Sequence, residues 1–127
     1  MKDYKPYQNW TRKKMYENIV DSCIKTGNDD LIAHYGNIVF DPRWNPIEDY
    51  NGCNLIQDRL HIFPPCFEHD FNWFVLGGGI EYDKKFRDRC IQFGSSKFEA
   101  KRNFIGVRIG WIFYNKWNKM YKRYKNK

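Results

Sequence analysis

The hydrophobic residues of this chain recur at helical spacing in several segments that end at glycines. Met15, Ile19 and Cys23 fall on one face of a predicted helix over residues 11–26, and Gly27 is placed to end it. This pattern indicates that the N-terminal segment contributes an amphipathic helix to the core.

The next part of the chain carries weaker patterns. Residues 31–35 are predicted to form a short helix that Gly36 ends, and residues 38–40 a short strand inside a loop over residues 37–50. Residues 51–65 show no clear periodicity and predict a long connection. Such connections are usually functional or held by a cross-link.

Residues 66–76 are predicted to form a helix, because two prolines precede them and the glycines 77–79 follow. Helical spacing from Cys66 places an adjacent pair, His69 and Asp70, on the same stripe as apolar side chains. A buried carboxylate needs a partner, because without one it costs several kcal/mol or takes up a proton.

A further helix is predicted over residues 81–93, and Asp83 lies on its apolar side. The turn at residues 77–79 is short, so the two helices should run antiparallel and side by side. This arrangement can bring Asp83 to His69, with Asp70 as a second carboxylate next to the imidazole. The alternative is an ordinary pair of core side chains without a catalytic role.

The net charge of +7 comes entirely from the C-terminal quarter of the chain. Residues 100–127 hold nine Lys or Arg and no acidic residue, so the remainder carries 13 basic and 15 acidic residues. A last helix is predicted over residues 98–124. Its aromatic and basic residues suit contact with anionic lipid headgroups. Nucleic acid or another protein of an assembly is an alternative partner. The simplest interpretation is a solvated basic tail without a partner. The predicted contact residues are Trp111, Lys116, Trp117, Lys119, Lys122 and Arg123.

Length and composition indicate one mainly α-helical domain over residues 1–127. Residues 1–50 would supply N-terminal helices and a loop, residues 51–93 a loop and the central helix pair, and residues 94–127 the basic aromatic helix. No apolar run reaches the roughly 18 residues of a membrane span, and the first residues do not resemble a secretory signal. We therefore expect a protein that is cytoplasmic or carried in a virus particle and that acts on a membrane.

Three elements in this order resemble the small phospholipases A2, especially the bacterial and fungal branch. They cover about a third of the chain and read Asn51-Gly52-Cys53, Cys66-Phe67-Glu68-His69-Asp70-Phe71 and Asp83-x-x-Phe86. The resemblance implies a small helical fold in which two antiparallel core helices and a calcium loop form the active site. It also implies calcium-dependent hydrolysis of a phospholipid acyl ester.

By this resemblance, His69 would be the catalytic base, Asp83 would orient it, and Asp70 would bind calcium. Asn51 and Gly52 would belong to the calcium loop, where carbonyl and side-chain oxygens complete the shell that calcium prefers. The resemblance also implies a disulfide between Cys53 and Cys66, which would connect the loop to the helix that carries the base. Buried free thiols at both positions are the alternative.

The chain departs from the family at Asn51, where many bacterial relatives have Asp, so calcium binding would be weaker. Trp73 stands where the family has an aromatic residue, often Tyr. Cys23 and Cys90 match no motif and are expected to be buried thiols, and His34 is expected to have no functional role.

A zinc site is a competing interpretation of the same region. Its four ligands would be Cys53, His61, Cys66 and His69. Their spacing is not a standard one, and zinc would leave Asp83 without a role, so calcium is favoured. Without the zinc site His61 is expected to be incidental. The alternative to an enzyme is a non-catalytic structural or interaction protein on the same scaffold, such as a phage virion or tail component.

Overall fold

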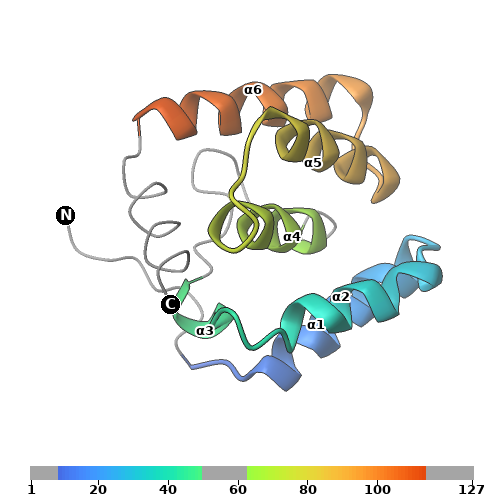
Figure 1. The fold of residues 1–127 in the computed structure, drawn as a ribbon. Helices are drawn as coiled ribbons and strands as arrows, with labels where there is room; N and C mark the ends of the chain where they lie inside the picture. The colour runs from blue at the N-terminus through green and yellow to red at the C-terminus, as the bar shows by residue number, and fades with distance from the viewer. Residues whose placement is uncertain (1–8, 50–62, 114–127) are drawn as a thin grey trace.

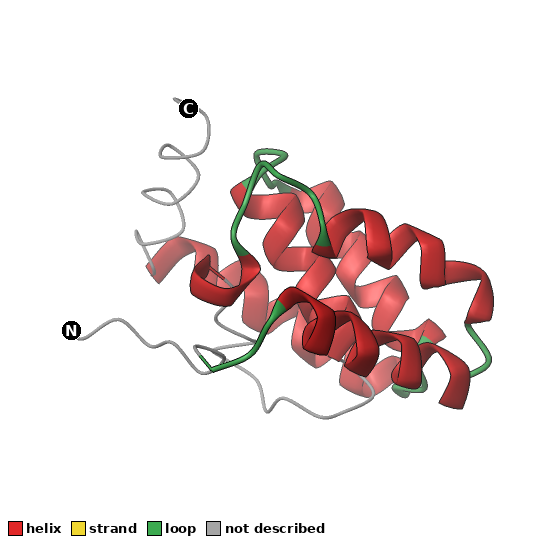
Figure 2. Ribbon diagram, turned by 90° about the horizontal axis from the view of Figure 1, so that it is seen from below, coloured by secondary structure: helices red, strands yellow, loops and turns green. Residues whose placement is uncertain are grey.

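The structure, a computed structural model, describes residues 9–49 and 63–113. These residues form helices joined by loops, with no strand among them, so the predicted mainly helical class is confirmed (Figure 2). In chain order the elements are α1 (Arg12–Lys25), the 3-10 helix η1 (Asp29–Leu31), α2 (Ile32–Val39), α3 (Pro46–Asp49), α4 (Phe63–Phe74), α5 (Ile80–Gln92) and α6 (Lys97–Phe113).

Helix α4 lies at the centre of the described part of the molecule (Figure 1). Helices α5 and α6 pack together on one side of it, and α1 and α2 pack together on the other. All twelve residues of α4 are buried. Any polar side chain on α4 must therefore find its hydrogen-bond partners inside the protein.

The first helix forms where the hydrophobic pattern predicted it. Thr11 is its N-cap and accepts a hydrogen bond from an amide of the first turn, while Met15, Ile19 and Cys23 have no exposed surface. The chain leaves the helix through Gly27, whose φ of 74° is a conformation that glycine adopts without steric cost.

The prediction for residues 31–40 was wrong in two respects. Helix α2 does not stop at Gly36 but continues to Val39, and residues 38–40 therefore form the end of a helix and not a strand. Gly36 lies inside the helix against the ring of Tyr16, where an added Cβ would come within 3.2 Å of a ring carbon. The glycine therefore permits close packing of α2 on α1.

The end of α2 is held by side chains from other elements. The guanidinium of Arg12 donates to the carbonyl oxygens of Val39 at 2.7 Å, Asp41 at 3.1 Å and Trp44 at 2.7 Å. The indole of Trp44 donates to the carbonyl of Ile38 at 2.8 Å. The bonds to Ile38 and Val39 satisfy carbonyls that a helix end leaves without intrahelical partners. The bonds to Asp41 and Trp44 hold the loop that follows the helix.

Helix α4 begins about one turn before its predicted start, and both prolines lie in its first turn. The glycines 77–79 separate it from α5 and have φ values of 97°, 65° and 123°. A Cβ on Gly78 would lie 2.2 Å from the ring of Trp73. The glycines are therefore required by the turn, because both its backbone and its contact with α4 exclude larger residues.

Helix α5 agrees with its prediction to within one residue at each end. Helix α6 begins with a reciprocal cap: the amide of Glu99 donates to Oγ of Ser96, and the amide of Ser96 donates to Oε1 of Glu99. The predicted continuation of this helix over residues 114–124 lies outside the described residues.

Candidate active site

The antiparallel helices α4 and α5 bring His69 and Asp83 into contact. Nε2 of His69 lies 2.6 Å from Oδ1 of Asp83, and the two side chains are 4% and 0% exposed. The contact between His69 and Asp83 that the sequence predicted is therefore present in the structure.

Asp83 accepts two further hydrogen bonds. The indole Nε1 of Trp73 donates to the same oxygen, Oδ1, at 2.8 Å, and Nη1 of Arg108 donates to Oδ2 at 2.8 Å. The carboxylate thus has three donors, two from α4 and one from α6. Such a set of partners is what makes a buried carboxylate tolerable.

The surroundings of Asp83 favour its charged form. Burial raises the pKa of Asp83, but the hydrogen bond and charge of His69 and the hydrogen bonds from Arg108 and Trp73 lower it by more, so the pKa lies below its usual value. An ionised carboxylate can only accept hydrogen bonds, so Nε2 of His69 donates to it.

Aromatic rings hold the imidazole of His69 in place. Its centroid lies 4.9 Å from that of Phe86 on α5 and 6.3 Å from that of Trp73 on α4. An imidazole that donates from one nitrogen to a carboxylate has its tautomer and orientation fixed, and its other nitrogen can then act as a base.

Asp70 follows His69 on α4 and is 2% exposed. Its carboxylate offers the hard oxygen ligands that calcium prefers. The other predicted calcium ligands, Asn51 and Gly52, lie outside the described residues. Within the two described ranges, no three His, Cys, Asp or Glu side chains are grouped as a metal site.

The cysteine predictions have separate outcomes. Cys23 and Cys90 are free buried thiols, as expected, and burial is the largest cause that raises their pKa values to about 11 and about 12. Cys66 is buried in the first turn of α4. Cys53 lies outside the described residues, so the bridge between Cys53 and Cys66 stays a prediction.

Two of the proposed zinc ligands, Cys53 and His61, also lie outside the described residues. The bond from His69 to Asp83 gives Asp83 a partner without any metal. The calcium site and the competing zinc site both stay predictions.

A third buried carboxylate, Glu68, was missed by the sequence analysis. It accepts from Tyr35 Oη at 2.9 Å and Arg89 Nε at 3.1 Å, and it lies 2.9 Å from Nε2 of His34 and 3.6 Å from Nζ of Lys85. Burial raises the pKa of Glu68, but the bond from His34 and the charge of Arg89 lower it by more. His34, for which no functional role was expected, has a structural one, because it hydrogen-bonds this carboxylate.

The sequence does contain signals for the missed residues. Eight of the twelve residues of the helix that carries Glu68 are apolar, so a charged residue in it requires an internal partner. Arg108 is the only charged residue between residues 103 and 115, which equally indicates a buried partner. Neither signal identifies which residue that partner is.

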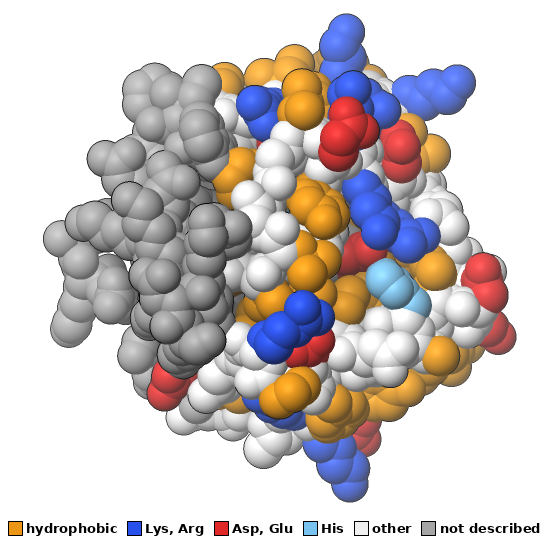
Figure 3. Space-filling view, viewed as in Figure 1, with side chains coloured by type: hydrophobic (Ala, Val, Ile, Leu, Met, Phe, Trp, Pro, Cys, Tyr) orange, Lys and Arg blue, Asp and Glu red, His pale blue; other side chains and the backbone are white. Residues whose placement is uncertain are grey.

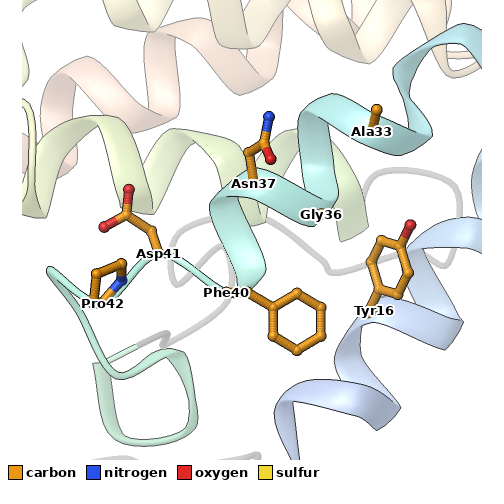
Figure 4. A pocket seen from close by; sticks show the side chains of 7 residues that line it. All are labelled: Tyr16, Ala33, Gly36, Asn37, Phe40, Asp41 and Pro42. Carbon is orange, nitrogen blue, oxygen red and sulfur yellow. The ribbon is translucent and has the colours of Figure 1, made fainter.

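An open cavity of about 500 Å³ lies away from these carboxylates, between α1 and α2 (Figure 4). Figure 4 shows the rings of Tyr16 and Phe40 together at one side, while Asn37 and Asp41 point away from them. Asp41 already accepts a bidentate hydrogen bond from Arg43. The cavity shares no residue with the His69 site, and its lining is completed by Ala33, Gly36 and Pro42.

Apolar side chains are exposed among charged ones on the surface (Figure 3). Leu76 and Ile80 flank the turn between α4 and α5, and Ile105 and Ile109 lie on α6. Of the helices in the described ranges, none is long and apolar enough to cross a membrane.

The predicted membrane-contact residues lie almost entirely beyond the described part of the chain. Trp111 is in α6, but its side chain is not described. The other five are outside the described residues, namely Lys116, Trp117, Lys119, Lys122 and Arg123. Their contact with lipid or another partner stays a prediction.

No protein family model, no curated protein and no solved structure matches this chain.

Proposed function

We propose that this chain is a phospholipase A2-like enzyme that hydrolyses an acyl ester of a phospholipid in the presence of calcium. The observation that carries the proposal is the buried hydrogen bond between His69 and Asp83. Burying a histidine and a carboxylate together costs stability unless the pair is well satisfied, and such pairs are common where an imidazole must act as a base.

The reaction follows from the roles of these side chains. His69 takes a proton from a water molecule, and the water oxygen adds to the ester carbonyl carbon. Asp83 stabilises the imidazolium that forms. When the tetrahedral intermediate collapses, the ester C–O bond breaks and His69 returns the proton to the lysophospholipid oxygen. The products are a fatty acid and a lysophospholipid, and no covalent enzyme intermediate is needed.

Asp70 is the described residue best suited to hold the metal, because its carboxylate adjoins the base on a buried helix. Asn51 and Gly52 of the preceding loop would complete the ligands. Calcium bound there would supply a positive charge that polarises the ester carbonyl. The chemistry of the donor present, a carboxylate, suits calcium.

Contact with a membrane is part of the proposal. The exposed Leu76, Ile80 and Ile109 offer apolar surface. Tryptophan and lysine residues of the basic segment, among them Trp111 and Lys116, would settle at anionic headgroups.

The decisive experiment measures fatty-acid release from mixed phospholipid vesicles, with calcium and with chelator, under oxidising and reducing conditions. We expect calcium-dependent release by the wild type and a loss of about 10²–10⁴-fold in His69→Ala. His34→Ala is the matched control, since it removes the other histidine that contacts a buried carboxylate, and it should retain activity if folded.

No release by the folded wild type would contradict the proposal. The His69–Asp83 pair would then be structural, and the non-catalytic alternative, a structural component of a larger assembly such as a virion, would replace it.

A further inference from the structure

The two oxygens of Asp83 have different partners. Oδ1 accepts from His69 and Trp73, which both belong to α4, whereas Oδ2 accepts from Arg108 on α6. The three donors therefore approach the carboxylate from two helices. Because a carboxylate can rotate about its terminal torsion, donors on both oxygens restrict that rotation more than donors on one.

Arg108 is held in the right place by the packing of α6 on α5. The helices run side by side, and the guanidinium of Arg87 lies over the ring of Phe104, 5.4 Å from its centroid. Phe104 is one turn before Arg108, and Arg87 is one turn after Asp83, so the two contacts fix a common register. Arg108 itself is 33% exposed, and its bond to Asp83 is a charge-assisted one.

We propose that Arg108 is a positioning residue for the base of this site. It holds Oδ2 of Asp83 so that Oδ1 stays directed at Nε2 of His69. This inference rests on the proposed function, and it assigns no contact between Arg108 and the substrate. The sequence elements that resemble a phospholipase do not include this residue.

The first test compares the kinetics of fatty-acid release by Arg108→Gln, Arg108→Lys and the wild type. Arg108→Gln is expected to lower kcat by about tenfold or more with little change in KM, and Arg108→Lys to recover part of the loss. Arg102→Gln is the matched control, because it removes an exposed positive charge from the same helix. Equal losses in Arg102→Gln and Arg108→Gln, or no loss in Arg108→Gln, would overturn the proposal.

A second test does not depend on activity, so it remains decisive if the wild type releases no fatty acid. Proton NMR can follow the Nε2 proton of His69 and the indole proton of Trp73, each assigned by its absence in His69→Ala or Trp73→Phe. Both resonances should shift or broaden in folded Arg108→Gln and stay near their wild-type positions in Arg102→Gln. Unchanged resonances in Arg108→Gln would show that Arg108 does not position the carboxylate.

Discussion

The carboxylate of Asp83 combines complete burial with three hydrogen bonds and the nearby positive charge of Arg108. Its folded pKa is lower than the value of about 3.9 expected in the unfolded chain. The folded protein therefore binds this proton less readily than the unfolded one. The resulting stability is fully present above the unfolded pKa and is lost as the pH falls through the folded pKa.

The substitution Asp83→Asn should reveal this contribution. At neutral pH we expect it to lower the free energy of unfolding by about 3–5 kcal/mol, because it breaks a buried pair. The difference from the wild type should narrow as the pH falls below the unfolded pKa and through the lower folded pKa, where the wild-type carboxylate loses its charge. Urea unfolding from neutral pH downwards measures the difference.

The matched control for this series is Asp88→Asn on the same helix, where the side chain is 66% exposed. It should change the free energy of unfolding by less than about 0.5 kcal/mol throughout. If the difference in the free energy of unfolding between wild type and Asp83→Asn did not vary with pH, the lowered pKa of Asp83 would not be the source of this stability.

Between elements, Glu68 connects the central helix to both of its neighbouring layers. Its partners His34 and Tyr35 belong to α2, and Arg89 and Lys85 belong to α5. A single carboxylate on α4 therefore joins three helices. Removing its charge leaves buried donors without their acceptor, which costs more than losing a surface ion pair.

We predict that Glu68→Gln lowers the free energy of unfolding by about 3–5 kcal/mol. Glu81→Gln is the control, because Glu81 is 82% exposed and its pair with Lys84, at 3.5 Å, contributes at most about 1 kcal/mol. Chemical denaturation of the two variants makes the comparison. Similar losses of unfolding free energy in Glu68→Gln and Glu81→Gln would show that the contacts of Glu68 contribute little to holding the helices together.

The helices were predictable to different degrees, and the reasons are physical. Helices α1 and α5 follow from apolar periodicity and glycine ends, which are local properties of the sequence. The end of α2 was predicted wrongly because a glycine is locally a signal for the end of a helix. Gly36 instead lies inside the helix and permits its contact with α1. The pairing of His69 with Asp83 was predictable because a short turn fixes their helices.

Arg108 was not assigned to Asp83 because that contact depends on how α6 packs against α5, and no local pattern specifies this register. The same holds for His34 and Glu68, which are 34 positions apart. Sequence periodicity thus identified the helix faces that carry His69 and Asp83. The contacts of Arg108 and His34 with the buried carboxylates depend on tertiary packing, which periodicity does not specify.

At the scale of the whole molecule, calcium should couple to stability through Asp70. A ligand that binds only the folded state raises the free energy of unfolding, by about 2.7 kcal/mol when its concentration is 100 times its Kd. We therefore predict that calcium raises the melting temperature of the wild type and has little effect on Asp70→Asn. Magnesium, which demands a stricter octahedral shell, is the matched control and should raise it less.

Scanning calorimetry with calcium, magnesium and chelator makes this measurement. If calcium raised the melting temperature of wild type and Asp70→Asn equally, calcium would bind elsewhere on the protein. The absence of any rise at millimolar calcium would mean that Asp70 holds no calcium under these conditions.

The complete burial of α4 also has a consequence for how this sequence can change over time. A helix without a solvent-facing side offers no position where a substitution is nearly neutral, so its twelve residues tolerate little neutral drift. The helices around it have exposed faces and can diverge freely there. Descendants of a common ancestor would then keep the α4 string, the buried positions packed against it and a carboxylate at the position of Asp83, while the exposed faces of the other helices changed first.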